Sequence, residues 1–206
     1  IQHTQMTVTY NFDDFIEQAI DSTRGDQQKI ESRGYETVTN PWMQFRRQDA
    51  IIYHPNGVVP RRPMEAPSDR FVFTEASYAE QLTGLSTGDS TALLNHLSKN
   101  TCLLIGLSLE DETLRTLLVQ SARTNPGNYH YYVFKVDPKE PLDQEHRNAV
   151  RQTNFNVYNL VTLYLTVEEI GAVADLISCE DDELKDFAAV HGIRIAYRYY
   201  VTGPLG

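Results

Sequence analysis

The chain has 206 residues and a formal net charge of −10, from 18 Lys and Arg against 28 Asp and Glu. Roughly 100–200 residues make one domain, so we expect residues 1–206 to form a single domain. The acidic balance argues against nucleic-acid binding, because phosphate contacts need clustered Lys and Arg. No apolar run reaches about 18 residues, the length of a membrane span, and the first residues lack the pattern of a signal peptide. We therefore expect a cytoplasmic protein with no direct contact to nucleic acid or membrane.

The first part of the chain alternates between strand and helix patterns. Residues 7–10 are β-branched and aromatic and predict a strand, after which the apolar residues Phe12, Phe15, Ile16, Ala19 and Ile20 recur at helical spacing. Residues 21–49 are polar and irregular, and we predict no regular element there. Residues 50–53 predict a second strand, which ends at His54-Pro55-Asn56-Gly57.

The middle of the chain continues this alternation. The proline-rich residues 57–69 predict a loop, and Phe71–Phe73 predicts a third strand. Helices are expected at residues 77–82 and 90–99. The apolar run of residues 101–105 has the pattern of a strand buried on both faces of a parallel sheet.

The last part of the chain holds one further clear strand and several helical patterns. After Gly106 we predict a helix with Leu114, Leu117 and Leu118 on its inner face, then a strand at residues 131–134. Residues 157–178 and 181–190 predict helices, and residues 193–201 predict a final strand. Strands that alternate with helices favour an α/β fold with a parallel sheet, in which ligands bind at the carboxyl ends of the strands.

Polar residues follow three of the predicted strands. Asn11 can present its amide to a ligand or orient a water. Asp13 and Asp14 begin a helix, where capping is the commoner role of an acidic residue. His54 can act as a general base, since the unperturbed pKa of histidine is about 6.5, although most loop histidines are only hydrogen-bonded. We expect Ala at position 11 or 54 to leave the fold intact.

The third strand end carries Gly106 and Ser108. Gly106 allows close backbone approach to a ligand. Ser108, with Asp111 three residues later, has a loose capping-box pattern, and its hydroxyl can also donate to a phosphate or ribose oxygen. Both roles are compatible.

These motifs together resemble a known family. A strand ending T-x-N-x-D, a strand ending H-x-x-G and a buried strand ending G-x-S-L follow the order of the sirtuin-like fold, here at residues 9–13, 54–57 and 106–109. Residues 73–78 and 111–115 are similar to the bacterial sirtuin-like branch of antiphage defence proteins. The resemblance covers roughly residues 5–137.

The resemblance implies a Rossmann-like domain that hydrolyses NAD to nicotinamide and ADP-ribose. Catalysis would use Asn11 to position a water or the ribose, His54 as general base near the ribose hydroxyls, and Asp13 on the nicotinamide-ribose side. The residues implied in NAD binding are Thr9, Asn11, Asp13, Gly106 and Ser108. Implied partners are further copies of the chain, or further domains or subunits of a defence complex.

Two departures from the family pattern carry expectations of their own. Deacetylase sirtuins hold zinc with four cysteines, whereas this chain has only Cys102 and Cys179, so we expect no metal. The family also opens with a glycine-rich strand-turn-helix, and nothing of that kind precedes Thr7, so we expect that unit to be lacking and the isolated chain to hydrolyse NAD poorly. Residues 137–206 are expected to add only a helical layer and a last strand.

Two alternative functions remain open. The chain could be a non-catalytic module that binds a nucleotide or a partner, or a zinc-independent protein deacylase that uses NAD. Asn11 and His54 favour an enzyme over a scaffold, because a degenerate module need not keep both polar strand ends.

Overall fold

The computed structural model of the chain describes residues 6–23, 34–39, 50–61, 67–68, 71–83, 91–139 and 142–178, together with residues 183 and 186. The chain divides into two compact units, Ile1–Thr166 and Val167–Gly206. Among the described residues, no helix is both long and apolar enough to cross a bilayer.

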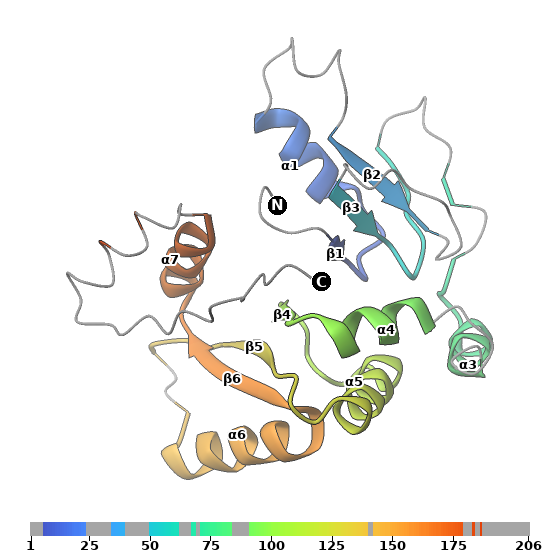
Figure 1. Cartoon of the computed structure of the whole chain (residues 1–206). Coiled ribbons are helices and arrows are strands. Elements are labelled where there is room, and N and C mark those ends of the chain that lie inside the picture. Colours follow the sequence, from blue (N-terminus) through green and yellow to red (C-terminus); the bar gives the residue numbers. More distant parts are fainter. Residues whose placement is uncertain are drawn as a thin grey trace, which may run out of the picture. The chain divides into compact units, whose positions relative to one another are not determined.

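The first unit contains two three-stranded sheets, and every strand pair in them is parallel (Figure 1). The first sheet has the order β1-β3-β2 and consists of β1 (Met6–Val8), β2 (Tyr35–Val38) and β3 (Ala50–Tyr53). The second has the order β4-β5-β6 and consists of β4 (Leu103–Ile105), β5 (His130–Lys135) and β6 (Leu160–Leu165).

In the described part of the chain, helices lie between β1 and β2 and between the successive strands from β3 to β6, as is usual for parallel pairing. In the first unit these are α1 (Phe15–Thr23), α3 (Glu75–Thr83), α4 (Thr91–Lys99), α5 (Glu112–Thr124) and α6 (Gln144–Tyr158). The second unit contains α7 (Val167–Ser178). Parallel sheets with flanking helices confirm the predicted Rossmann-like α/β class.

The main core lies between the second sheet and helices α4 and α5. Its buried members are Leu93, Leu97, Leu104, Leu114, Leu117, Leu118, Tyr132 and Leu160. The inner face predicted for α5 is therefore confirmed. Each fully buried leucine contributes about 1.5–3 kcal/mol relative to an exposed one, so this cluster is a large source of stability. Val8 of β1 packs against the same cluster, which links the two sheets.

Asparagine side chains hold the amino end of β5. Asn125 donates to the carbonyl of Ser98 at 2.9 Å, and Asn128 donates to the carbonyl of Leu97 at 2.7 Å. Asn159, which ends α6 in the left-handed region with φ 54°, donates to the carbonyl of Asn128 at 3.2 Å. These bonds satisfy main-chain oxygens at the ends of α4 and of the loop before β5.

Three predicted elements are wrong. Residues 35–38 form β2, inside the segment expected to be irregular. Phe71–Phe73 is not a strand: the Val72 N–H bonds only to the carbonyl of Asn56, and the rings of Phe71 and Phe73 stack with each other. The long helix at residues 157–178 is instead the end of α6, then β6, then α7, because the left-handed Asn159 stops the first helix.

Two further expectations are corrected, and others lie outside the described residues. In β4 only Leu104 is buried, while Leu103 is 37% and Ile105 50% exposed, so this strand is not buried on both faces. In α1 the apolar Phe15, one of the residues at helical spacing, is exposed, and the charged Glu17 is buried. The predicted strand at residues 193–201 and most of the predicted helix at residues 181–190 lie outside the described residues.

Candidate functional site

The candidate site forms where β1 and β3 end side by side. The Thr9 N–H bonds to the carbonyl of Tyr53 at 3.0 Å, just past the last ladder pair. The His54 N–H bonds to the carbonyl of Val38 at the end of β2, at 2.8 Å. Because all three strands run parallel, the T-x-N-x-D segment and His54 arrive at the same edge of the first sheet.

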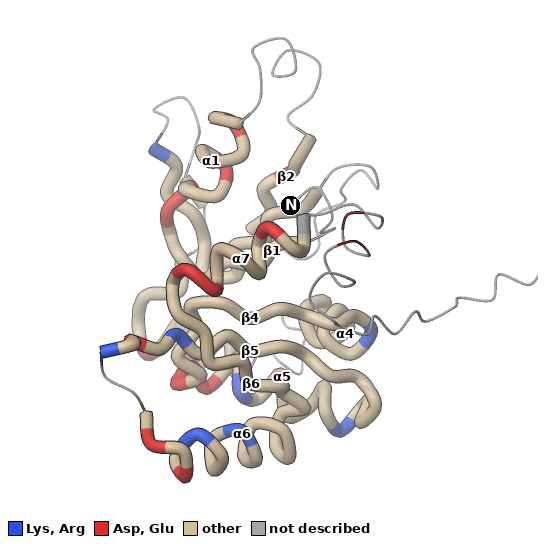
Figure 2. The backbone as a smooth tube through the Cα atoms, turned by 90° about the vertical axis from the view of Figure 1, so that its left-hand side faces the viewer, with Lys and Arg blue, Asp and Glu red and all other residues tan. Residues whose placement is uncertain are grey.

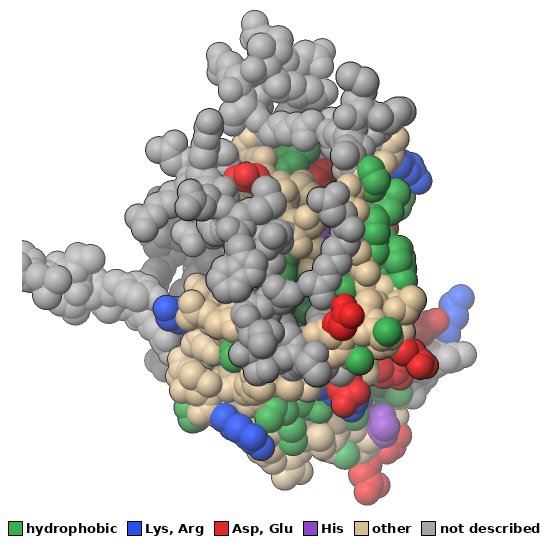
Figure 3. Space-filling view, turned by 90° about the vertical axis from the view of Figure 1, so that its right-hand side faces the viewer, with side chains coloured by type: hydrophobic (Ala, Val, Ile, Leu, Met, Phe, Trp, Pro, Cys, Tyr) green, Lys and Arg blue, Asp and Glu red, His purple; other side chains and the backbone are tan. Residues whose placement is uncertain are grey.

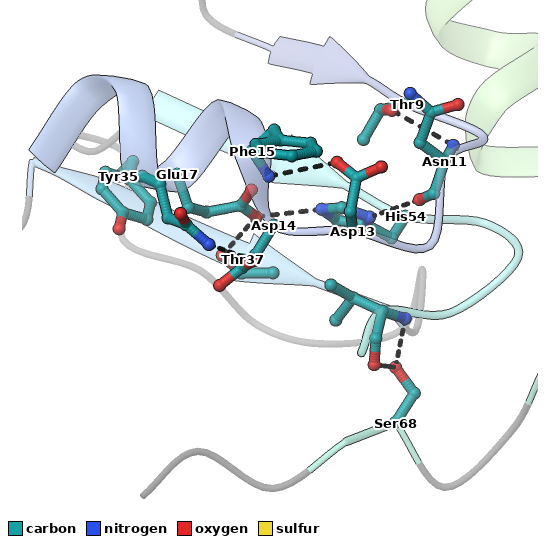
Figure 4. A network of polar contacts seen from close by, with 12 residues as sticks. Thr9, Asn11, Asp13, Asp14, Phe15, Glu17, Tyr35, Thr37, His54 and Ser68 are labelled. Atoms are coloured by element: carbon teal, nitrogen blue, oxygen red, sulfur yellow. Dashed lines mark hydrogen bonds and ion pairs between the residues drawn. The ribbon is translucent and has the colours of Figure 1, made fainter. Parts of the chain in front are cut away.

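The segment after β1 is organised by its own side chains (Figure 4). The Asn11 N–H bonds to the Thr9 hydroxyl at 3.2 Å, and the Phe15 N–H bonds to the Asp13 carboxylate at 3.2 Å. Asp13 therefore braces the turn before α1, as Asx side chains do when they bond to the N–H two residues on. The Asn11 side chain is exposed, so it lies where a ligand could reach it.

Asp14 is buried and fastens α1 to the loop that follows β3. Its carboxylate accepts from the backbone N–H of Arg61 at 3.1 Å and from the side-chain amide of Gln18. The guanidinium of Arg61 lies 4.7 Å from the centre of the Phe15 ring, a cation–π contact. These bonds fix the position of the helix that begins directly after the Asn11 segment.

His54 is fully buried, and both of its ring nitrogens are bonded. Nδ1 lies 3.1 Å from the backbone carbonyl of Asn11, and Nε2 lies 2.9 Å from Oε1 of Glu17. The same Glu17 oxygen accepts from the Thr37 hydroxyl at 3.0 Å. Figure 4 shows the imidazole between the Asn11 segment and Glu17. His54 is therefore more than a hydrogen-bonded loop residue, since it joins β3, α1 and the T-x-N-x-D segment.

The hydrogen bonds around Glu17 determine the charge of its carboxyl. Burial favours a raised pKa for the Glu17 carboxyl, but hydrogen bonds from His54, from its own backbone and from Thr37 outweigh it and lower the pKa from its ordinary value of 4.5. Glu17 is thus ionised near neutral pH, and the proton shared with His54 resides on Nε2. The Asn11 carbonyl can only accept, so Nδ1 is the donor in its 3.1 Å contact whenever that nitrogen carries a proton.

The turn after β4 holds the remaining predicted residues. Gly106 has φ 71°, and a Cβ there would meet no described atom within 4 Å, so the turn borders open space. The Ser108 hydroxyl accepts from the Glu110 N–H at 3.3 Å, whereas Asp111 caps α5 by accepting from the Leu114 N–H at 2.8 Å. The expected capping box is therefore wrong, since the helix cap is Asp111 and Ser108 braces the turn before it.

The structure brings Thr9, Asn11, Asp13 and His54 into one group. In the described part of the chain, no hydrogen bond joins this group to Gly106 or Ser108. Tyr10 connects the group to the segment that follows β4. Burial raises the pKa of its phenol, and the nearby Asp111 and Tyr53 raise it further. Its hydroxyl is buried and has no partner among the described residues. The ends of β1 and β4 are therefore neighbours through Tyr10 and Asp111.

Sequence reasoning missed Glu17, Thr37 and Tyr10. Glu17 lies three residues after Asp14, on the same side of a helix, and that spacing was the only available signal for it. Thr37 lies in the strand that was not predicted. Tyr10 was assigned only to the strand pattern, although a buried tyrosine normally needs a partner for its hydroxyl.

The cysteines and the other potential metal ligands are described only where the structure places them. Among the residues that the structure describes, no three His, Cys, Asp or Glu side chains group as metal ligands. Burial raises the pKa of the Cys102 thiol to about 11, which keeps it protonated and a poor ligand at neutral pH. Cys179 lies outside the described residues.

Comparison with known proteins adds one match. A family model described as a SIR2-like domain matches residues 5–159, which include all three motifs and every strand up to β5. No curated protein matches the chain. The match covers most of the chain and starts at the strand that carries the T-x-N-x-D segment. The chain therefore belongs to the SIR2-like domain family, which implies a function that uses NAD.

Proposed function

We propose that this protein is a metal-independent NAD hydrolase of a prokaryotic defence system, which cleaves NAD to nicotinamide and ADP-ribose. The observation that carries the proposal is the grouping of Asn11, Asp13 and His54 at the ends of β1 and β3, the edge at which parallel α/β sheets bind ligands. We further propose that it acts in the cytoplasm, as a homo-oligomer or with other domains or subunits of a defence complex.

The reaction needs charge stabilisation more than acid catalysis. The bond between ribose C1′ and the nicotinamide nitrogen breaks, and its electron pair leaves with nicotinamide, which becomes neutral. The positive charge moves onto the ribose. A water oxygen then bonds to C1′ and its proton is released. The site must hold the sugar, steer the water and stabilise the cationic centre.

The acidic character of the Asn11 segment suits this chemistry. Figure 2 shows Asp and Glu residues along the start of α1, where the sequence has Asp13, Asp14 and Glu17. Negative charge there favours the cationic nicotinamide-ribose half of NAD. In this proposal Asp13 lies on that side, and the Asn11 amide positions the water or the ribose.

His54 is proposed as the general base near the ribose hydroxyls. Its Nδ1 is the ring nitrogen on the Asn11 side, and it bonds to the Asn11 carbonyl in this structure. Base catalysis therefore requires that the Nδ1 proton depart and that this contact open when the substrate or water arrives.

We propose that the turn after β4 lines the site of the phosphates and ribose of NAD. The open space beside Gly106 fits close approach of a ligand, and the Ser108 hydroxyl lies on the same turn. Thr9 supports the other side through its bond to the Asn11 N–H. Tyr10 adds a buried hydroxyl without a described partner between the two strand ends.

The test is product analysis. The chain is incubated with NAD, with and without an acylated peptide, and nicotinamide and ADP-ribose are quantified by chromatography. We expect equal amounts of both products without peptide, and a loss of at least about 100-fold in Asn11→Ala. Asn156→Ala, an exposed asparagine of α6, is the matched control. Turnover that depends on the peptide would indicate a deacylase, and NAD binding without turnover would indicate a binding module.

A further inference from the structure

We infer that Glu17 is a positioning residue of the candidate site: its carboxylate holds the Nε2 side of the His54 ring, so that Nδ1 is the nitrogen directed to the Asn11 segment. The kinetic consequences of this inference rest on the proposed NAD hydrolysis. The geometry itself does not, because the contacts exist independently of the substrate.

The placement of Glu17 is specific. The residue lies on the buried face of α1, and one carboxylate oxygen, Oε1, contacts both His54 at 2.9 Å and the Thr37 hydroxyl at 3.0 Å. Helix α1, strand β2 and the end of β3 thus meet at this one atom, as Figure 4 shows. Two contacts from different elements leave the carboxylate little freedom to turn, and the ring that it binds is fixed with it.

The energetics favour a positioning role over a stabilising one. A buried ion pair is often no more stabilising than well-packed apolar residues of the same volume. The second oxygen of Glu17, Oε2, is buried without a partner among the described residues, which adds a desolvation cost. The orientation that Glu17 imposes on the His54 ring explains why a buried carboxylate stands at this position.

The other charged groups near α1 have partners of their own. Asp14 accepts from the Arg61 backbone and from Gln18, and Asp21 accepts from the Tyr35 hydroxyl at 3.1 Å. From β2, Thr37 faces Glu17 and is not titratable. From the end of β3, His54 faces it. Glu17 is therefore the carboxylate that acts on the His54 ring.

The two ring nitrogens of His54 therefore have different roles. Glu17 keeps Nε2–H occupied, as the carboxylate of a catalytic triad does for its histidine. A proton exchanged with the site must then pass through Nδ1. Replacing Glu17 by Gln keeps the size of the side chain and removes the negative charge that faces Nε2.

The test combines a spectrum with kinetics. Histidine labelled with nitrogen-15 is incorporated into the chain, and His54→Gln assigns the ring signals. We expect the Nε2–H signal of the His54 ring, which is hydrogen-bonded to Glu17 in the wild type, to shift or disappear in Glu17→Gln. The kcat of NAD hydrolysis should fall in Glu17→Gln while KM changes little, because the ring loses the contact that orients it. Glu145→Gln, at an exposed position of α6, is the control and should change neither.

The two readouts separate failure of this inference from failure of the proposed function. Unchanged ring signals in a folded Glu17→Gln variant would overturn the inference, and so would a kcat equal to that of the wild type. If the wild type does not hydrolyse NAD, the proposed function fails, and the spectra still decide the role of Glu17. Glu17→Ala serves as a second variant, in which the ring should lose its fixed orientation and show averaged signals.

Discussion

Replacement of His54 by Ala is expected to destabilise the fold as well as the site. The imidazole is 0% exposed and is hydrogen-bonded to Glu17 and to the Asn11 carbonyl. Its removal leaves the buried Glu17 carboxylate without its hydrogen-bond partner, and deleting one partner of a buried pair costs about 3–5 kcal/mol. A domain is stable by only about 5–15 kcal/mol, so this is a large fraction. The expectation from sequence that this variant keeps the fold intact is therefore corrected.

The measurement is urea unfolding followed by far-UV circular dichroism. With an m-value of about 2–3 kcal/mol per molar urea, the midpoint of His54→Ala should fall by about 1–2 M. Asn11→Ala, which changes an exposed side chain, should stay within about 0.5 kcal/mol of the wild type. The double variant Glu17→Ala/His54→Ala should regain part of the loss, because it removes the buried charge as well. A midpoint for His54→Ala within about 0.2 M of the wild type would refute the reasoning.

Four further predictions follow from the same structure. The pKa of Glu17 is lowered from 4.5 in the folded protein, so the ionised carboxylate contributes fully to stability above about pH 4.5. This contribution is lost as the pH falls through the pKa of the folded state. Urea midpoints measured in acid should therefore fall for the wild type, and Glu17→Gln should lack this fall. Burial lowers the pKa of His130 from 6.5, so the unfolded chain gains its proton first and stability should fall as the pH drops below 6.5; His130→Gln should flatten this fall. Gly106→Ala should cost about 1 kcal/mol in thermal unfolding because φ is 71°, and it should weaken NAD binding measured by calorimetry. Elemental analysis of the purified chain should find less than one zinc per molecule, and one full equivalent would contradict this.

The motif order and the strand ends were predictable because their signals are local. β-branched and apolar runs indicated β1, β3, β4 and β5, and each of the three motifs directly follows such a run. The first two motifs converge because β1 and β3 pair in parallel, whereas the third follows β4, which belongs to the other sheet. The strand order therefore predicts Asn11 and His54 as neighbours, while the site roles of Thr9 and Asp13 are predicted by the family resemblance.

The missed elements depend on partners that are distant in the sequence. β2 has two buried ends, Tyr35 and Val38, with half-buried Glu36 and Thr37 between them, and it becomes a strand by pairing with β3. Phe71 and Phe73 have high strand propensity, yet they join no ladder: their rings stack on each other, Phe73 also stacks on Phe12, and Phe71 is tilted against Phe12. Tertiary pairing overrides local propensity in both cases.

The burial of Glu17 was also beyond local reasoning. A helix pattern favours apolar residues such as Phe15 for the inner face. The inner position belongs to Glu17 because its partner is His54, 37 residues later in the chain. Phe15 is instead exposed. Figure 3 shows that hydrophobic side chains also lie at the surface on one face of the molecule.

The asparagine bonds at the start of β5 divide the second sheet into a fixed end and an adaptable end. Side-chain amides tie the ends of α4 and α6 to the loop before β5, while Gly106 borders open space at the carboxyl end of β4. Backbone amides beside His130 should exchange with solvent deuterium among the slowest in the protein, and those around Gly106 much faster. Selection can then remodel the turns that meet a substrate without loosening the layer that keeps the strands in register.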